Sequence, residues 1–249
     1  PHGAVVVGEI GDSERGLELL EDYTGVPGRV QMSYVFDFLS GDGLQAARVV
    51  EVFDRLHSIA PNAWPCWAMS NHDVMRHISR WSLTDQAAKA YCTLLMCLRG
   101  SVCLYQGEEL GLPEAELQFE DLRDPYGIEF WPEYKGRDGS RTPMVWDMGV
   151  NGGFSTSQPW LPVPHAHLQR TVVAQEADAQ SVLHHYRWAI GLRNKHSALR
   201  LGSMSDMKAD GPILSFTRAD SEQTLRIRAN LSEEEVGGLA PWQVQVIEG

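Results

Sequence analysis

Cysteine is scarce in this chain of 249 residues, which contains only Cys66, Cys92, Cys97 and Cys103. They form no C-x-x-C pair, and no histidine follows them at the spacing of a zinc finger. Isolated cysteines of this kind usually behave as small apolar residues of a protein core. The cysteine content therefore favours a reducing compartment, and we expect a cytoplasmic protein.

Long apolar runs and positive charge are also missing. No run approaches the roughly 18 apolar residues that a membrane span needs, and we expect no signal peptide, since residues 1–30 lack its pattern. Lys and Arg number 21 against 33 Asp and Glu, which gives a net charge of −12. An acidic chain without a basic patch repels nucleic-acid phosphates and anionic lipid. We therefore expect neither a nucleic acid nor a membrane as a partner.

The chain does contain an alternation of short apolar runs and amphipathic segments. Hydrophobic residues make up 43% and charged residues 22%, as in globular proteins. The predicted strands cover residues 4–7, 30–38, 66–69 and 101–105, and the predicted helices cover residues 14–20, 44–59 and 85–98. Thr84 can cap the last helix, and Gly100 can stop it. Fully buried strands separated by helices predict a parallel sheet, an α/β architecture.

The second half of the chain differs in texture. Residues 112–165 are rich in Pro, Gly, Trp and Asp and predict a long loop region, followed by a helix at residues 181–195. Short runs near 213–217, 225–229 and 242–247, two of which alternate apolar and polar residues, predict a small antiparallel β-module. We expect one domain over residues 1–200, including the loop region, and a second over residues 201–249.

Two polar groups follow predicted strands and could carry chemistry. Glu9 lies at the mouth of an apolar strand, where partial shielding from water would suit a general acid, although many strand ends simply expose a glutamate. The triplet Asn71-His72-Asp73 follows the third predicted strand and could bind sugar hydroxyls, a metal or a nucleophilic serine, or could form a hydrogen-bonded turn. No G-x-S-x-G motif occurs, which argues against a serine hydrolase.

Other motifs argue against cofactors. The segment at residues 5–11 resembles the approach to a dinucleotide loop but lacks G-x-G-x-x-G, so we reject that interpretation. His165 and His167, and likewise His184 and His185, have no nearby Cys or Asp at ligand spacing. We therefore expect no metal site and no cofactor. Aromatic residues are interleaved with charged ones in the middle of the chain, which suits sugar stacking or ordinary core packing.

Four segments together resemble one family. They are WAMSNHD at residues 67–73, LRGSVCLYQGEELGL at residues 98–112, DPY at residues 124–126 and GRDGSRTPM at residues 136–144. In this order they resemble the α-glucosidase and oligo-1,6-glucosidase branch of the α-amylase superfamily, glycoside hydrolase family 13. The resemblance implies a (β/α)₈ TIM barrel with an antiparallel C-terminal β-domain.

The resemblance also implies retaining hydrolysis of α-glucosidic bonds in maltose- or isomaltose-like oligosaccharides. Matched onto the family's motifs, Glu9 would be the general acid/base and Asp73 the carboxylate that stabilises the transition state. His72 and Arg141 would hold the glucose unit, and Asn71 and Arg137 would contribute to the same substrate site.

One family motif has no counterpart here. The nucleophilic aspartate lies in a Gly-Phe-Arg-x-Asp-like motif after the fourth barrel strand, and the sequence has no such motif. Because Glu9 matches the end of the fifth strand, we expect the second half of the barrel, strands 5–8, with a shortened β-domain. Half a barrel has open sheet edges, so we expect pairing with an N-terminal half or self-association, and little activity alone.

Any structural metal of the family would lie in the absent half. The alternatives are a non-catalytic half-barrel remnant, or a fragment of a transglucosylase or sucrose-acting relative.

Overall fold

The computed structural model describes residues 3–12, 14–41 and 43–249, and these form two compact units. The first unit comprises the chain up to Ala68 together with Lys89–Cys103 and Ala189–Gly249, and the second comprises Met69–Ala88 and Leu104–Trp188. Both β-sheets belong to the first unit. The predicted domain boundary near residue 200 stays a prediction.

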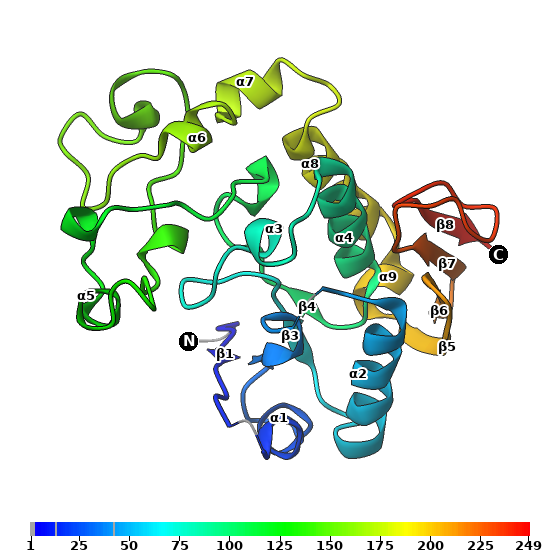
Figure 1. Cartoon of the computed structure of the whole chain (residues 1–249). Helices are drawn as coiled ribbons and strands as arrows, with labels where there is room; N and C mark the ends of the chain where they lie inside the picture. The colour runs from blue at the N-terminus through cyan, green and yellow to red at the C-terminus, as the bar shows by residue number, and fades with distance from the viewer. Residues whose placement is uncertain (1–2, 13, 42) are drawn as a thin grey trace. The chain divides into compact units, whose positions relative to one another are not determined.

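The first sheet is parallel, as the alternation of strands and helices predicts. Its strands lie in the order β1-β2-β3-β4, and each pair of neighbours is parallel (Figure 1). They are β1 (Val7–Gly8), β2 (Met32–Val35), β3 (Pro65–Trp67) and β4 (Ser101–Val102). The connections contain the helices α1 (Gly16–Thr24), α2 (Ala46–Ile59), α3 (His77–Arg80) and α4 (Asp85–Cys97), and the 3-10 turn η1 (Phe36–Phe38). The sheet is consistent with a partial α/β barrel.

Helix α2 covers the sheet with one apolar face. Its buried residues recur at helical spacing: Ala46, Val49, Val52, Phe53 and Leu56. The ring of Phe53 lies 5.1 Å from that of the buried Trp67 in β3. Phe38 stacks on the same indole at 4.7 Å. This aromatic cluster fixes the central strand β3, whose C-terminal end leads into the Asn71-His72-Asp73 triplet.

The expectation of four fully buried strands is wrong for three of them, because only β3 is buried throughout and β2 is buried at alternate residues. The two edge strands are the least buried. Strand β1 is shorter than the predicted run, and Val5, Val6 and Val7 are exposed. Residues of β4 are half-buried, whereas all three residues of β3 are buried. The cause is position in the sheet, because β1 and β4 each have one neighbouring strand, so one side of each lacks a cover.

The second sheet is antiparallel, in the order β5-β6-β7-β8, as predicted for the C-terminal module. Its strands are β5 (Ser203–Asp210), β6 (Ile213–Ala219), β7 (Thr224–Asn230) and β8 (Val244–Glu248). In β7 the alternating residues Leu225, Ile227 and Ala229 are buried. Strand β5 has no apolar alternation and was not predicted. The short helix α9 (Ser197–Leu201) precedes it.

The second unit is mostly irregular, in agreement with the predicted loop region. Its longest helix is α8 (Val182–Lys195), which continues into the first unit, and its remaining elements are single turns. These are η2 (Glu108–Leu110), η3 (Phe119–Asp121), α5 (Pro125–Glu129), η4 (Asp138–Ser140), η5 (Val150–Gly153), α6 (His165–Leu168) and α7 (Val172–Glu176). A small core of Leu110, Leu112, Val145 and Leu183 holds them together. Within the described ranges, every helix is too short or too polar to cross a membrane.

Candidate active site

The turn after β3 is shaped by Asn71. Its Oδ1 accepts hydrogen bonds from the backbone N–H groups of Asp73, at 2.8 Å, and Val74, at 3.0 Å. An asparagine that bonds to the backbone two residues further on closes an Asx turn. Asn71 thus fixes the backbone next to Asp73, and its side-chain oxygen Oδ1 is used for the turn.

Asp73 lies between two arginines that are more than 60 residues away in the sequence. Its Oδ1 accepts hydrogen bonds from Arg137 Nη1 and Arg141 Nη2, both at 3.0 Å. Its Oδ2 lies 3.4 Å from His72 Nε2. The side chain of Asp73 is 39% exposed. The structure therefore brings together four of the predicted site residues, from the turn after β3 and from the segment around η4.

Arg141 also fixes the backbone of the triplet. Its Nε donates to the carbonyl oxygen of His72 at 2.7 Å. The guanidinium group therefore contacts both a side chain and a main-chain group of the same turn. An arginine fork has the fixed geometry for such a double contact, and a lysine does not.

Arg137 is fixed by hydrogen bonds to Asp124, a residue for which the sequence predicted no role. Arg137 Nε and its backbone N–H both donate to Asp124 Oδ2 at 2.8 Å, and Arg137 Nη2 donates to Oδ1 at 3.0 Å. The Asp124 side chain has no exposed surface. These hydrogen bonds from Arg137 lower the pKa of Asp124 to about 2. Asp124 also caps α5 before Pro125, and an Asp before a helix-starting Pro is a signal that could have revealed it.

Asp138 completes this line of carboxylates. Its Oδ2 accepts the backbone N–H groups of Arg123, at 2.6 Å, and Asp124, at 2.7 Å. The chain of contacts runs from Asp138 through Asp124 and Arg137 to Asp73. Each carboxylate has a donor, so the charges of the cluster are compensated.

Arg76 is a second residue that sequence reasoning did not identify. It is 1% exposed, and its guanidinium donates from Nη1 to the Gln106 carbonyl oxygen at 2.6 Å and from Nη2 to the Ser140 carbonyl oxygen at 2.9 Å. Its backbone N–H donates to Glu114 Oε2 at 2.8 Å. A Cβ on Gly107, whose φ is +86°, would lie 2.6 Å from Arg76 Nη1. Gly107, which belongs to the motif at residues 98–112, thus leaves room for the side chain of Arg76.

Glu108 is buried next to this arginine. It is 2% exposed, and in the described part of the chain neither carboxylate oxygen has a hydrogen-bond partner. Burial raises its pKa to about 8, although the charge of Arg76 opposes the shift. Nearby Ser70 bonds to the ring of His77 instead, at 2.9 Å, and burial lowers the pKa of His77 to about 3. Both titratable groups are therefore uncharged at neutral pH.

Glu9 lies in the first unit, directly after β1, and is exposed. The expected shielding by an apolar strand is absent because β1 is an edge strand with exposed valines. In the same unit, Tyr34 Oη lies 2.9 Å from Cys103 Sγ. This hydrogen bond and burial raise the pKa of Tyr34, and the charge of Glu9 adds to the shift. The role of Glu9 as a general acid stays a prediction.

One histidine of each pair contacts a neighbouring oxygen atom of the protein. His167 is buried, and its Nε2 lies 2.8 Å from the Pro113 carbonyl oxygen. His184 Nδ1 lies 3.0 Å from Ser181 Oγ. No group of three or more His, Cys, Asp or Glu side chains in the described residues is arranged to hold a metal ion.

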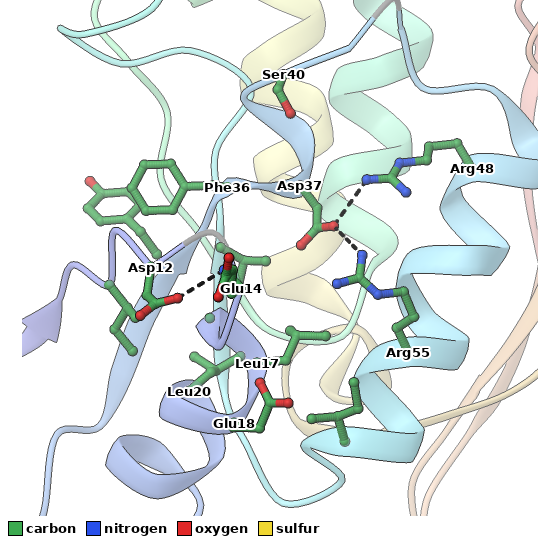
Figure 2. Close-up of a pocket in the computed structure, with 15 residues that line it drawn as sticks. Asp12, Glu14, Leu17, Glu18, Leu20, Phe36, Asp37, Ser40, Arg48 and Arg55 are labelled. Carbon is green, nitrogen blue, oxygen red and sulfur yellow. Dashed lines mark hydrogen bonds and ion pairs between the residues drawn. The ribbon is translucent and has the colours of Figure 1, made fainter.

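A cavity of about 300 Å³ in the first unit contains a further charged group. Figure 2 shows Asp37 between two arginines of α2, with Oδ1 3.2 Å from Arg48 Nη2 and 3.4 Å from Arg55 Nη1. Asp12, Glu14 and Glu18 also line the cavity. The carboxylate of Asp37 is thus paired with two arginines of the same cavity.

Comparison with known proteins adds three findings. A family model described as alpha amylase, catalytic domain, matches residues 4–202. A protein of Rhizobium meliloti (strain 1021) named "Probable alpha-glucosidase" is 51% identical over 232 residues, which are 92% of this chain and 42% of that protein. An "Oligo-1,6-glucosidase" of Heyndrickxia coagulans is 30% identical over 277 residues, covering 94% of this chain and 49% of that protein.

A solved structure is also similar to this chain in fold and sequence. The crystal structure of an alpha-glucosyl transfer enzyme has a TM-score of 0.86 and 45% sequence identity, covering 93% of this chain and 43% of that one. This chain therefore spans less than half the length of each of these three relatives.

Proposed function

Because this chain belongs to the alpha-amylase catalytic-domain family of glycoside hydrolases, we propose that it forms the glucose-binding and acid–base part of a retaining α-glucosidase. This proposal rests mainly on the position of Asp73 between Arg137 and Arg141. The two arginines occupy Oδ1, and among the described residues Oδ2 has only the 3.4 Å contact with His72. Oδ2 therefore remains available to a ligand.

This arrangement suits a glucose unit that develops positive charge. In retaining hydrolysis, the anomeric carbon passes through an oxocarbenium-like transition state. A half-exposed carboxylate held in place by two guanidinium groups stabilises that charge without having to reorganise. The His72 ring and the Arg141 fork supply donors for neighbouring hydroxyl groups of the same sugar.

Glu9 is proposed as the general acid/base. In the first step a carboxylate attacks the anomeric carbon, the glycosidic C–O bond breaks, and Glu9 gives its proton to the leaving oxygen. In the second step Glu9 takes a proton from water, and the water oxygen replaces the carboxylate on the sugar. The sequence contains no Gly-Phe-Arg-x-Asp-like motif to supply the attacking carboxylate. We propose that these 249 residues alone have little or no α-glucosidase activity.

The missing group would come from a further polypeptide segment. The edge strands β1 and β4 have unpaired sides that another segment can complete. We propose a cytoplasmic location for the assembled protein, since the four cysteines of this chain form no disulfide.

The test is to assay the chain on maltose, isomaltose and a chromogenic α-glucoside. It should be assayed alone and fused to the portion of the Rhizobium meliloti relative that it does not match. We expect turnover only in the fusion, and a loss of at least about 100-fold for Glu9→Gln and for Asp73→Asn. Asp85→Asn is the matched control, because Asp85 pairs with Arg170 away from the cluster. Turnover by the isolated chain that matches the fusion would refute the proposal.

A second candidate is glucosyl transfer, which the 45% identity to an alpha-glucosyl transfer enzyme favours. The two activities share the first step and differ in whether water or another hydroxyl completes the second. Product analysis of the fusion with excess maltose separates them, because transfer yields longer oligosaccharides and hydrolysis yields glucose. If neither product forms, the non-catalytic remnant is the correct alternative.

A further inference from the structure

A cavity of about 420 Å³ lies in the second unit, in contact with Arg141. Its lining includes the apolar side chains Phe154, Pro159 and Trp160 and the charged side chains Arg123, Asp138 and Arg141. Small-molecule sites in proteins commonly measure about 300–1,000 Å³ and combine an apolar lining with a few polar groups. The size and lining of this cavity fit that description.

Trp160 lines the cavity and follows a loop that is closed by hydrogen bonds. The side chain is 77% exposed although it lines the cavity. Asn151 holds the loop that precedes it, because its Nδ2 donates to the carbonyl oxygens of Ser155 and Ser157, each at 2.9 Å. An exposed indole on an anchored loop is positioned to stack on the apolar face of a ring.

Arg141 has hydrogen-bonding capacity left on its guanidinium. Its Nε and Nη2 contact His72 and Asp73, but Nη1 makes no hydrogen bond to any residue that the structure describes. Asp138 is similar, since its Oδ2 accepts two backbone N–H groups and its Oδ1 has no partner in the described ranges. Two residues that line the cavity, Arg141 and Asp138, thus have one donor atom and one acceptor atom without a partner among the described residues.

We propose that this cavity binds a glucosyl unit of an α-glucoside oligosaccharide, as a second sugar site that shares Arg141 with the Asp73 site. An aromatic face combined with a charged donor and acceptor is the combination that a pyranose needs, since its ring carries C–H groups on its faces and hydroxyls at its edge. The choice of an α-glucoside rests on the proposed function, whereas the cavity and its lining do not.

The shared arginine links the two sites. A sugar hydroxyl that accepts from Arg141 Nη1 immobilises the guanidinium whose Nη2 holds Asp73. A ligand in the cavity therefore favours the arrangement in which Asp73 is correctly oriented, and by linkage a ligand at Asp73 favours binding in the cavity.

The test uses the full chain labelled with 5-fluorotryptophan and observed by ¹⁹F NMR. The chain has eight tryptophans, and Trp160→Phe identifies the resonance of Trp160. Titration with maltose should shift this resonance saturably. Maltose affinity should fall about tenfold in Trp160→Ala and in Asp138→Asn, and Trp160→Phe should retain most of it because the ring still stacks. Trp146→Ala is the matched control, since Trp146 is exposed in the same unit but does not line the cavity.

Asp73→Asn separates this inference from the proposed function. The Trp160 resonance should still respond to maltose in Asp73→Asn, with weaker affinity. No response in the wild type, an equal response to glycerol, or unchanged maltose affinity in Trp160→Ala would overturn the second site. An active fusion would leave the proposed function standing in each of these cases. Conversely, a saturable Trp160 response combined with an inactive fusion would support the sugar site and reject the hydrolase.

Discussion

Arg76 Nη2 donates a hydrogen bond to the carbonyl oxygen of Ser140 at 2.9 Å, and this contact joins two turns that are far apart in the sequence. One turn carries Asp73, three residues before Arg76, and the other carries Arg141, next to Ser140. The contact is enclosed, because both residues are buried. The pairing of Asp73 with Arg141 is therefore supported by a second, internal arginine.

Replacing Arg76 with methionine should lower the free energy of unfolding by about 3 kcal/mol, because buried carbonyl oxygens lose their charged donor. The carbonyl oxygen of Gln106 loses the 2.6 Å bond from Nη1. That of Ser140 keeps the Tyr105 hydroxyl at 3.1 Å. Urea unfolding followed by circular dichroism measures the change. Arg187→Met is the matched control and should change stability by less than about 0.5 kcal/mol, since Arg187 forms an exposed ion pair with Glu176. Equal losses in the two variants would contradict the role of Arg76.

Two glycines of the first unit should respond to alanine in opposite directions. Gly100 has a φ of +126°, and a Cβ there would lie 2.7 Å from both the Pro65 carbonyl oxygen and Trp67 Nε1. Gly191 lies within α8, where an added Cβ meets nothing within 4 Å. Gly100→Ala should therefore destabilise the protein by at least about 2 kcal/mol, and Gly191→Ala should stabilise it by up to about 1 kcal/mol. Thermal unfolding of both variants measures the difference, and a destabilising Gly191→Ala would contradict this account of α8.

The helices were predicted from the sequence more accurately than the strands. The predicted helices at residues 44–59 and 85–98 correspond to α2 (Ala46–Ile59) and α4 (Asp85–Cys97), and Thr84 Oγ1 accepts from the Ala87 N–H at 3.2 Å as a cap. The apolar run at residues 30–38 gives a strand only at Met32–Val35, followed by a 3-10 turn. A continuous apolar run shows burial but not the point at which the backbone leaves the sheet.

The same limit applies to the candidate site. The resemblance assigns His72, Asp73, Arg137 and Arg141, which all lie in conspicuous polar motifs, to one site. The structure places these four residues next to one another, and their roles stay a prediction. Arg76 was missed because it is defined by burial and by partners at least 30 residues away. Asp124 carries a local capping signal before Pro125, but its contacts with Arg137 join residues 13 positions apart. Local periodicity and spacing carry no information about such contacts, and a charged residue in a polar segment looks like a surface residue.

Glu108 should make the stability of the protein depend on pH in the direction opposite to an ordinary carboxylate. Its pKa is about 8 when folded, against the ordinary glutamate value of 4.5, because burial disfavours the charged form. Between these two values the folded state holds one proton more than the unfolded state. The contribution of Glu108 is therefore fully present below pH 4.5 and is lost as the pH rises to about 8, with a slope of up to ~1.4 kcal/mol per pH unit.

The difference in unfolding free energy between wild type and Glu108→Gln isolates this group, because the other titrating groups cancel. Glutamine keeps the size of the protonated acid but has no proton to lose, so wild type should lose stability relative to Glu108→Gln steadily from pH 5 to pH 8. Urea unfolding at half-unit intervals of pH measures the difference, and ¹³C NMR of the Glu108 carboxyl should show a midpoint near 8. If the difference in unfolding free energy between the two proteins stays constant from pH 5 to pH 8, Glu108 does not titrate in this interval. That result would contradict the raised pKa of the buried carboxyl.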